Sequence, residues 1–356
     1  MTTISVTLRG QNDTCPVYIA PGLLPGIGGK LRAAFGGAQV AAVVTDDNVK
    51  ARYLQAVSES LAQAGFCPLA FSVPPGEASK SAETYFALLN WLAENRLTRT
   101  DAVVALGGGV VGDVAGFAAA TYLRGVPLAQ VPTTLLAMVD SSVGGKTAID
   151  LPSGKNLAGA FYQPSLVLCD PDVLATLPPE AFNDGCAEVV KYGMIRHDTL
   201  LERLIQLPVR QHLAEVIVDC VSIKRDVVQE DVFDVGERQL LNFGHTVGHA
   251  IEKLSGYGVS HGRAVAAGMG VMTRAAARKN LCPPECQTAL EAALERFGLP
   301  NRTGYAPKAL YEAALNDKKR AGGNITEVVP CAIGKCVLRN MPVGELLEWI
   351  ELGLEP

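Results

Sequence analysis

The first half of the chain alternates between short apolar runs and longer amphipathic stretches. Runs rich in Val, Ala and Leu occur at residues 40–45, 69–73, 101–106, 128–131 and 166–169. Their length and composition predict buried β-strands. Between them lie stretches such as 79–94, in which apolar residues recur at helical steps. Strand–helix alternation with continuously apolar strands predicts a parallel sheet that helices cover on both faces.

The second half has a different pattern. From about Ala181 onward the spacing of apolar residues is mostly helical, and Gly and Pro interrupt helices where strands no longer recur. We therefore place a domain boundary near residue 178. The prediction is a Rossmann-like α/β domain over residues 1–178 and an all-α domain over residues 179–356.

Composition excludes several classes of protein. The 356 residues carry a net charge of −5, so the charge balance favours neither nucleic acid nor an anionic membrane as a partner. No apolar run approaches the length of a membrane-spanning helix, and the first residues lack the pattern of a signal peptide. The nine cysteines include no Cys-x-x-Cys pair, which favours free thiols in a cytoplasmic protein.

Three of the five histidines, His245, His249 and His261, lie close together in the sequence. Imidazole is a common ligand for catalytic divalent metals. On a single helix Arg238, Asn242, His245 and His249 would share one face, as expected for the wall of a site. The opposite face would then carry core residues, namely Leu240, Leu241, Val247, Ile251 and Leu254.

A carboxylate joined to two of these histidines would complete an open metal site. Glu188 is the candidate, and spacing alone favours His245 and His249 as its partners because they are four residues apart. Two histidines and one glutamate leave a zinc position free for a substrate oxygen. Three hydrogen-bonded core histidines are the alternative interpretation.

The predicted α/β domain carries signals for phosphate and ribose binding. A glycine-rich run at residues 107–113 follows one predicted strand and opens a helix, where backbone N–H groups can bind a pyrophosphate. A tight structural turn is the alternative. Asn48 follows an earlier strand, and Glu77 and Lys80 follow another. Because parallel sheets bind ligands beyond the carboxyl ends of their strands, a dinucleotide is the expected ligand.

Basic side chains occur beside glycines in an otherwise acidic protein. Lys146 follows two glycines, Lys155 follows one, and Lys191 lies three residues after Glu188. Taken singly, each could be a solvated lysine or an exposed ion pair. Together they indicate an anionic small-molecule substrate.

Several motifs in order resemble the 3-dehydroquinate synthase family. They are Ser-Ser-Val-Gly-Gly-Lys at 141–146, Gly-Lys-Asn at 154–156, Glu-Val-Val-Lys-Tyr-Gly at 188–193 and the stretch 241–249. The resemblance extends from the first glycine-rich loop to residues 330–334, and it implies a dehydroquinate synthase-like fold. It also implies conversion of 3-deoxy-D-arabino-heptulosonate 7-phosphate to 3-dehydroquinate and phosphate, through oxidation at C5, elimination, reduction and an intramolecular aldol closure.

The resemblance also implies roles for individual residues. The ligands of Zn²⁺ or Co²⁺ would be Glu188, His245 and His261, in place of the pair that spacing favours. NAD would contact Asn48, Glu77, Lys80, Gly109, Val110, Val111, Gly112, Asp113, Thr133, Thr134, Lys146, Lys155 and Thr176. Substrate would contact Asp140, Lys146, Lys155, Asn156, Lys191, Lys224, Arg238, Asn242, His249 and either Lys318 or Lys319. Arg124 would reach the substrate phosphate of a neighbouring subunit, which implies a homodimer.

Three other functions fit parts of the pattern. Metal-dependent polyol dehydrogenases act on neutral substrates and would not need so many lysines. The substrates of other sugar phosphate cyclases have no carboxylate, so those enzymes would not need Lys224, Arg238 and Asn242 to bind one. A non-catalytic nucleotide-binding module would not need the metal ligands.

The chain departs from the family pattern at a few positions. Val232 and Asp234 stand where the family commonly has glutamates, and Arg263 replaces a glutamate two residues after His261. Because a cation facing a metal would be costly, we expect Arg263 to point away from it.

Overall fold

The structure, a computed structural model, describes residues 1–7, 14–318 and 323–355, without the side chains of 316–318. It divides into two compact units. The first comprises Met1–Pro178 and Cys220–Phe233, and the second comprises Pro179–Asp219 and Asp234–Pro356. The sequence pattern placed one boundary near residue 178. The return of Cys220–Phe233 to the first unit was not predicted.

A seven-stranded sheet forms the centre of the first unit. Its order is β1-β2-β9-β6-β5-β3-β4. The bounds are β1 (Thr2–Thr7), β2 (Thr14–Ile19), β3 (Val40–Asp46), β4 (Cys67–Val73), β5 (Ala102–Gly107), β6 (Leu128–Pro132) and β9 (Leu166–Cys169). β1 pairs antiparallel with β2. Every other pair of neighbouring strands in this order runs parallel. The five predicted strands correspond to β3, β4, β5, β6 and β9.

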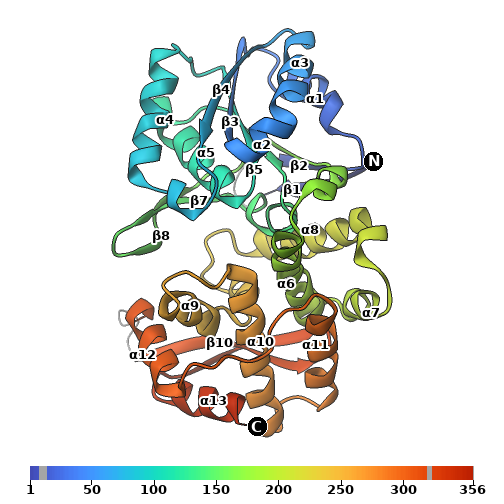
Figure 1. Ribbon diagram of the computed structural model, residues 1–356, viewed down its shortest axis with the longest axis vertical. Helices are drawn as coiled ribbons and strands as arrows, with labels where there is room; N and C mark the ends of the chain where they lie inside the picture. Colours follow the sequence, from blue (N-terminus) through green and yellow to red (C-terminus); the bar gives the residue numbers. More distant parts are fainter. Residues whose placement is uncertain (8–13, 319–322, 356) are drawn as a thin grey trace. The chain divides into compact units, whose positions relative to one another are not determined.

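Helices cover both faces of this sheet, with α4 and α5 on one side and α1 and α3 on the other (Figure 1). The helices of the unit are α1 (Ile27–Ala34), α2 (Asp47–Val49), α3 (Gln55–Gln63), α4 (Ala82–Glu94) and α5 (Gly109–Thr121), with short helices η1 (Leu24–Gly26), η2 (Lys50–Leu54), η3 (Glu77–Ser79), η4 (Tyr122–Arg124), η5 (Ala137–Ser141) and η6 (Pro171–Thr176). The helix predicted from residue 79 begins at Ala82, because the Ser81 hydroxyl caps it by accepting from the Thr84 N–H.

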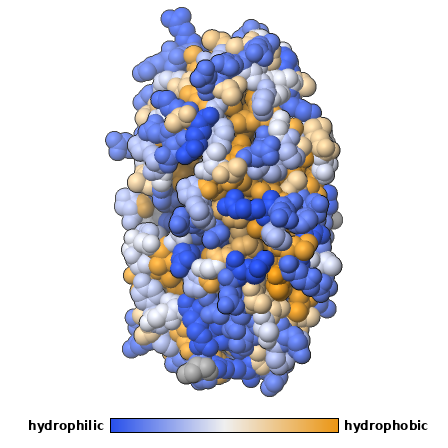
Figure 2. Space-filling model, turned by 45° about the vertical axis from the view of Figure 1, so that its right-hand side comes forward, coloured by the Kyte–Doolittle hydropathy of each residue, from blue (hydrophilic) through white to orange (hydrophobic). Residues whose placement is uncertain are grey.

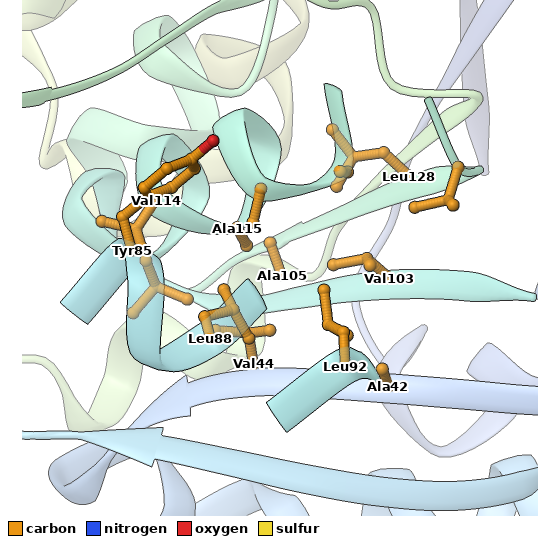
Figure 3. Close-up of a cluster of buried hydrophobic side chains, with 14 of the residues drawn as sticks. Ala42, Val44, Tyr85, Leu88, Leu92, Val103, Ala105, Val114, Ala115 and Leu128 are labelled. Carbon is orange, nitrogen blue, oxygen red and sulfur yellow. The ribbon is translucent and has the colours of Figure 1, made fainter. Parts of the chain in front are cut away.

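The core of the first unit lies between the sheet and the helices α4 and α5. Leu88 and Leu92 of α4 pack with Val44 of β3 and Val103 of β5, and Ala115 of α5 lies against the same layer (Figure 3). These side chains are almost completely buried. Burial of each leucine stabilises the fold by about 2 kcal/mol relative to exposure, which explains why the apolar runs become central strands.

A separate antiparallel hairpin carries part of the predicted basic cluster. Its strands are β7 (Lys146–Leu151) and β8 (Gly154–Phe161). Gly144 and Gly145 precede it with φ of 97° and 68°, a left-handed conformation that glycine adopts without strain. Lys146 and Lys155, which the sequence places beside glycines, lie in these two strands.

The second unit is mostly helical but is not all-α. Its elements are α6 (Pro179–Arg196), α7 (Asp198–Gln206), η7 (Val209–Gln211), η8 (Glu237–Asn242), α9 (His245–Leu254), α10 (His261–Arg278), α11 (Glu285–Arg296), α12 (Pro307–Lys318), α13 (Glu345–Leu354), β10 (Asn324–Ala332) and β11 (Lys335–Pro342), while α8 (Leu213–Glu230) belongs to both units. The antiparallel pair β10–β11 corrects the all-α expectation. Helix α10 packs against α6, α9, α11 and α13 (Figure 1).

The surface and the cysteines agree with the composition. On the face drawn in Figure 2, hydrophilic residues cover much of the surface and hydrophobic residues lie in patches among them. Within the described ranges, no helix combines the length and the apolar content needed to cross a membrane. All nine cysteines are free thiols, as expected, and burial raises the pKa of Cys282 to about 12.

Candidate functional site

One carboxylate and two imidazoles converge in the second unit. Glu188 lies on α6, His245 begins α9 and His261 begins α10. From Oε1 of Glu188 the distance is 3.6 Å to Nε2 of His245 and 3.4 Å to Nε2 of His261. The ligand atoms of all three residues lie within 4.8 Å of one another. This group has the donor types and the proximity of a divalent metal site.

A glycine turn places His245 at the start of its helix. Gly244 has φ of 78°, and a Cβ added there would lie 2.6 Å from the Met269 side chain. The backbone therefore cannot run as one helix from Arg238 to His249, and the prediction of a single four-residue stripe is wrong. Arg238 and Asn242 belong to the separate helix η8. Of the predicted core residues opposite the stripe, Leu240, Leu241, Val247 and Ile251 are buried, whereas Leu254 is exposed and does not belong to the core.

The two histidines differ in electrostatic environment. Burial lowers the pKa of His245 to about 3, although the Glu188 charge opposes that change. Burial also acts to lower the pKa of His261, but hydrogen bonds to Glu188 and Glu252 outweigh it and raise the pKa to about 10. His245 is therefore the imidazole that stays neutral, and His261 is the one held by two carboxylates.

Glu188 divides its two oxygens between different partners. Oε1 faces the histidines, and Oε2 contacts the ammonium of Lys191 one helical turn away. Both side chains are buried. A buried charge of this kind needs such partners, because an uncompensated carboxylate in an apolar environment costs several kcal/mol, about 3–5 when one partner is removed.

His249 lies on the exposed side of the same cluster. Its ring centroid is 5.5 Å from that of His245 and 6.1 Å from that of His261. With Glu252 and His261 it forms a second group of possible ligands. The sequence interpretation overlooked Glu252, although its position three residues after His249 on a helix was a usable signal.

Arg263 behaves as expected for a cation near such a group. Its side chain is exposed, and the guanidinium donates to the carbonyl of Gly298.

In the first unit, the glycine-rich run joins the end of β5 to the start of α5. Gly108 caps α5 without a side-chain hydrogen bond, so the first N–H groups of the helix have no side-chain cap. A Cβ on Gly107 would lie 2.7 Å from Val111, and one on Gly112 would lie 2.8 Å from Gln130. Internal packing thus requires these two glycines, as the structural-turn alternative predicts, while the helix end keeps the geometry of an anion site.

Other predicted nucleotide contacts lie at the ends of neighbouring strands. Thr133 follows β6, and its hydroxyl is buried without a hydrogen-bond partner among the described residues. Thr134 caps the next turn by accepting from the Ala137 N–H. Asn48 follows β3 and is exposed, and Glu77 follows β4. A buried Thr133 hydroxyl that has no hydrogen-bond partner among the described residues, beside the glycine turn, is consistent with a bound polar ligand.

Lys80 and Asp113 form an ion pair of 2.5 Å in this unit. Burial raises the pKa of Asp113 to about 6, and the Lys80 charge opposes that change only in part. The predicted contacts Gly109, Val110 and Val111 lie in the first turn of the same helix α5.

The predicted substrate contacts are divided between the two units. Asp140, Lys146, Lys155, Asn156 and Lys224 belong to the first, whereas Lys191, Arg238, Asn242 and His249 belong to the second. Lys155 lies 3.3 Å from Glu77, and the Asn156 N–H donates to Asp150. Arg238 is buried in η8, and Asn242 is exposed at its end.

Three further predictions fall elsewhere. Thr176 hydrogen-bonds Tyr53 at 2.6 Å, and Arg124 is exposed in η4. The predicted contact from Lys318 or Lys319 cannot be placed among the described residues, because they include neither the side chain of Lys318 nor Lys319.

Two solved structures share this fold along nearly the whole chain. A 2-deoxy-scyllo-inosose synthase, complexed with carbaglucose-6-phosphate, NAD⁺ and Co²⁺, is 27% identical with a TM-score of 0.88 over 99% of this chain and 100% of its own. The 2-epi-5-epi-valiolone synthase ValA of Streptomyces hygroscopicus, with NAD⁺ and Zn²⁺ bound, is 25% identical with a TM-score of 0.84 over 98% of both chains.

Sequence comparison identifies the family. The family model described as 3-dehydroquinate synthase N-terminal matches residues 70–184, and the one described as 3-dehydroquinate synthase C-terminal matches residues 185–320. A 3-dehydroquinate synthase of Enterococcus faecalis is 46% identical over 349 residues, which cover 96% of this chain and 97% of that protein. Both comparisons bear out the resemblance seen in the motifs, and the chain belongs to the 3-dehydroquinate synthase family.

Proposed function

We propose that this chain converts 3-deoxy-D-arabino-heptulosonate 7-phosphate to 3-dehydroquinate and phosphate, as a carbon–oxygen lyase that uses NAD and a divalent metal. The observation that carries the proposal is the group of Glu188, His245 and His261, whose ligand atoms lie within 4.8 Å of one another. Family membership at 46% identity over 96% of the chain supports the same reaction.

The residues of the first unit fit NAD. The start of α5 has no side-chain cap, so its N–H groups can donate hydrogen bonds to a pyrophosphate, and the buried Thr133 hydroxyl has no partner among the described residues. The exposed Asn48 side chain at the end of β3 suits a ribose hydroxyl. NAD⁺ in both related structures agrees with this assignment.

The residues of the second unit fit Zn²⁺ or Co²⁺. Two imidazoles and one carboxylate provide three protein ligands and leave a position for a substrate oxygen. Glu188 would bind through Oε1, because Oε2 contacts Lys191. Co²⁺ and Zn²⁺ in the two related structures agree with either metal.

When bound, NAD would accept and return a hydride at C5, and the metal would polarise the C5 hydroxyl. The chain itself would bind and orient the substrate. Lys146, Lys155 and Lys191 would balance its negative charge, and Lys224, Arg238 and Asn242 would bind its carboxylate and so fix its orientation. His249, exposed next to the metal ligands, would exchange a proton with the substrate.

We also propose that the enzyme acts as a homodimer. Arg124 is exposed in η4, where a neighbouring subunit could receive it. A guanidinium is suited to bind a phosphate with two hydrogen bonds. The partners are thus an anionic small molecule and a second copy of the chain.

The stoichiometry of NAD tests the reaction. Because the hydride returns to the same substrate, limiting NAD should support many turnovers, with phosphate released in step with product. Phosphate and the near-ultraviolet absorbance of NADH are followed together in excess substrate. Accumulation of one NADH per substrate consumed would instead indicate a polyol dehydrogenase. Equal turnover of a sugar phosphate that lacks the carboxylate would indicate another sugar phosphate cyclase.

A further inference from the structure

We infer that Glu252 is a positioning residue that holds the His261 ring so that Nε2 faces the metal position; this inference rests on the proposed function. Oε2 of Glu252 lies 3.5 Å from Nδ1 of His261, while Nε2 of the same ring lies 3.4 Å from Oε1 of Glu188. The imidazole therefore lies between two carboxylates, one at each ring nitrogen.

The second histidine of the group is held in a comparable way. Nδ1 of His245 lies 3.1 Å from the carbonyl oxygen of Phe243, and its Nε2 faces Glu188. In both rings, the acceptor at Nδ1 would keep a proton on that nitrogen, so that Nε2 could give up any proton of its own and present its lone pair to a bound metal. The two acceptors differ in charge, because one is a backbone carbonyl and the other is a carboxylate. A carboxylate at Nδ1 also increases the basicity of the ligating nitrogen.

The position of Glu252 explains how the contact forms. The residue lies on α9, seven residues after His245, and only 3% of it is exposed. A buried carboxylate costs free energy unless hydrogen bonds compensate it. The His261 N–H is one such donor, and it links α9 to the first residue of α10. Glu252 thus orients the ligand His261 through a hydrogen bond, and Glu188 remains the carboxylate ligand.

The same geometry allows one competing interpretation. His249, Glu252 and His261 also have ligand atoms within 4.8 Å of one another, so they could bind a second cation. In that case Nδ1 of His261 would be a ligand, and Glu252 would not orient the ring. The number of ions bound per chain separates the two interpretations.

The test measures zinc affinity by competition with a chromophoric chelator, together with the zinc content of each protein. Glu252→Ala should weaken zinc binding by about 10–100-fold. Glu252→Gln should fall between wild type and Ala, because its amide oxygen still accepts from Nδ1 but carries no charge. Glu348→Gln is the matched control, since that carboxylate pairs with Lys279 in the same unit and should leave zinc affinity unchanged. Circular dichroism checks that each metal-free variant folds, and the isosteric Gln variant answers the question where Ala does not fold.

His245→Ala separates the inference from the proposed function. That variant should lose zinc, whatever Glu252 does. If His245→Ala binds zinc as tightly as wild type, the assignment of the metal site is wrong, and the role inferred for Glu252 is wrong as well. If it loses zinc while both Glu252 variants bind within twofold of wild type, only the positioning role is wrong. Two zinc ions per wild-type chain and one per Glu252→Ala chain would establish the second cation site instead.

Discussion

Lys224 donates from its ammonium to both the carboxylate and the backbone carbonyl of Asp140, at 2.7 and 2.5 Å. The lysine lies in the part of α8 that belongs to the first unit, and the aspartate lies in η5. The lysine is buried and the carboxylate is partly exposed. This double contact ties Cys220–Phe233 to a sheet domain from which it is distant in sequence.

Lys224→Met should therefore destabilise the first unit. The loss of the Lys224 ammonium leaves the Asp140 carboxylate without this donor, which costs about 2 kcal/mol. Urea denaturation of Lys224→Met, Asp140→Asn and the double variant gives the coupling energy between the two side chains. The Arg225–Asp226 pair on the same helix, measured with Arg225→Met, Asp226→Asn and their double variant, is the matched control, because it is more exposed and should be worth at most about 1 kcal/mol. A coupling energy no larger than that of the control pair would contradict this account.

The parallel sheet could be predicted from the sequence because its strands are continuously apolar. The strands β3 and β5 are buried along nearly their whole length, so polar surface residues do not interrupt their apolar runs. The hairpin of β10 and β11 was missed because exposed and buried positions mix in β11, and because the buried run of β10 includes the polar Glu327 and the strand-disfavouring Pro330. Such short-range patterns do not distinguish a surface hairpin from a connection.

The site could be predicted in part for a related reason. Histidine clustering and Glu188 pointed to a metal group, but spacing favoured His249 over His261 as the second imidazole. Spacing assumes one continuous helix, and the left-handed Gly244 ends that continuity. His261 comes from a different helix, which only tertiary structure or the family resemblance could supply. The assignment of these residues as ligands remains a prediction.

Metal analysis of four variants tests that assignment. Glu188→Ala, His245→Ala and His261→Ala should each lose most bound metal, because three protein ligands leave little redundancy. His249→Ala should keep its metal and lose activity, since its ring lies beside the group and is exposed. Inductively coupled plasma analysis after gel filtration measures the metal per chain. A metal-free His249→Ala together with a loaded His261→Ala would favour the pair that spacing selects.

Asp101 should make the first unit sensitive to acid. Its carboxylate accepts from the backbone N–H groups of Gln39, Val40 and Thr98 and from the Thr98 hydroxyl. Burial acts to raise its pKa, but these hydrogen bonds outweigh that effect and hold the pKa below its usual value of 3.8. The folded state therefore binds the proton more weakly than the unfolded chain. The stability from this group is present above the unfolded pKa and is lost as the pH falls through the lower folded pKa.

Asp101→Asn should remove that dependence. At pH 7 the variant should be less stable by about 2 kcal/mol, because a charged acceptor of several hydrogen bonds is lost. The difference from wild type should shrink below about pH 4, where the Asp101 carboxyl of the unfolded chain begins to bind a proton that the folded protein binds only at lower pH. Urea denaturation at neutral and acidic pH measures it, with the exposed Asp172→Asn as control. A constant difference across this range would mean that packing, and not ionisation, accounts for the effect.

Arg124 should act in the site of the neighbouring subunit. It is exposed, and its φ of 67° places it in a turn directly after α5.

Arg124→Ala and His261→Ala homodimers should each have little activity. A heterodimer of the two, co-expressed with different affinity tags and purified over both, contains one site with an intact His261 chain and an arginine from its partner. It should recover about half of the wild-type activity, because two-fold symmetry pairs each site with the other chain's Arg124. The heterodimer of His261→Ala with Glu188→Ala is the control and should recover none, since both defects lie within the metal group of their own chain. No recovery in the Arg124 heterodimer, or a monomer by sedimentation, would place Arg124 outside a shared site.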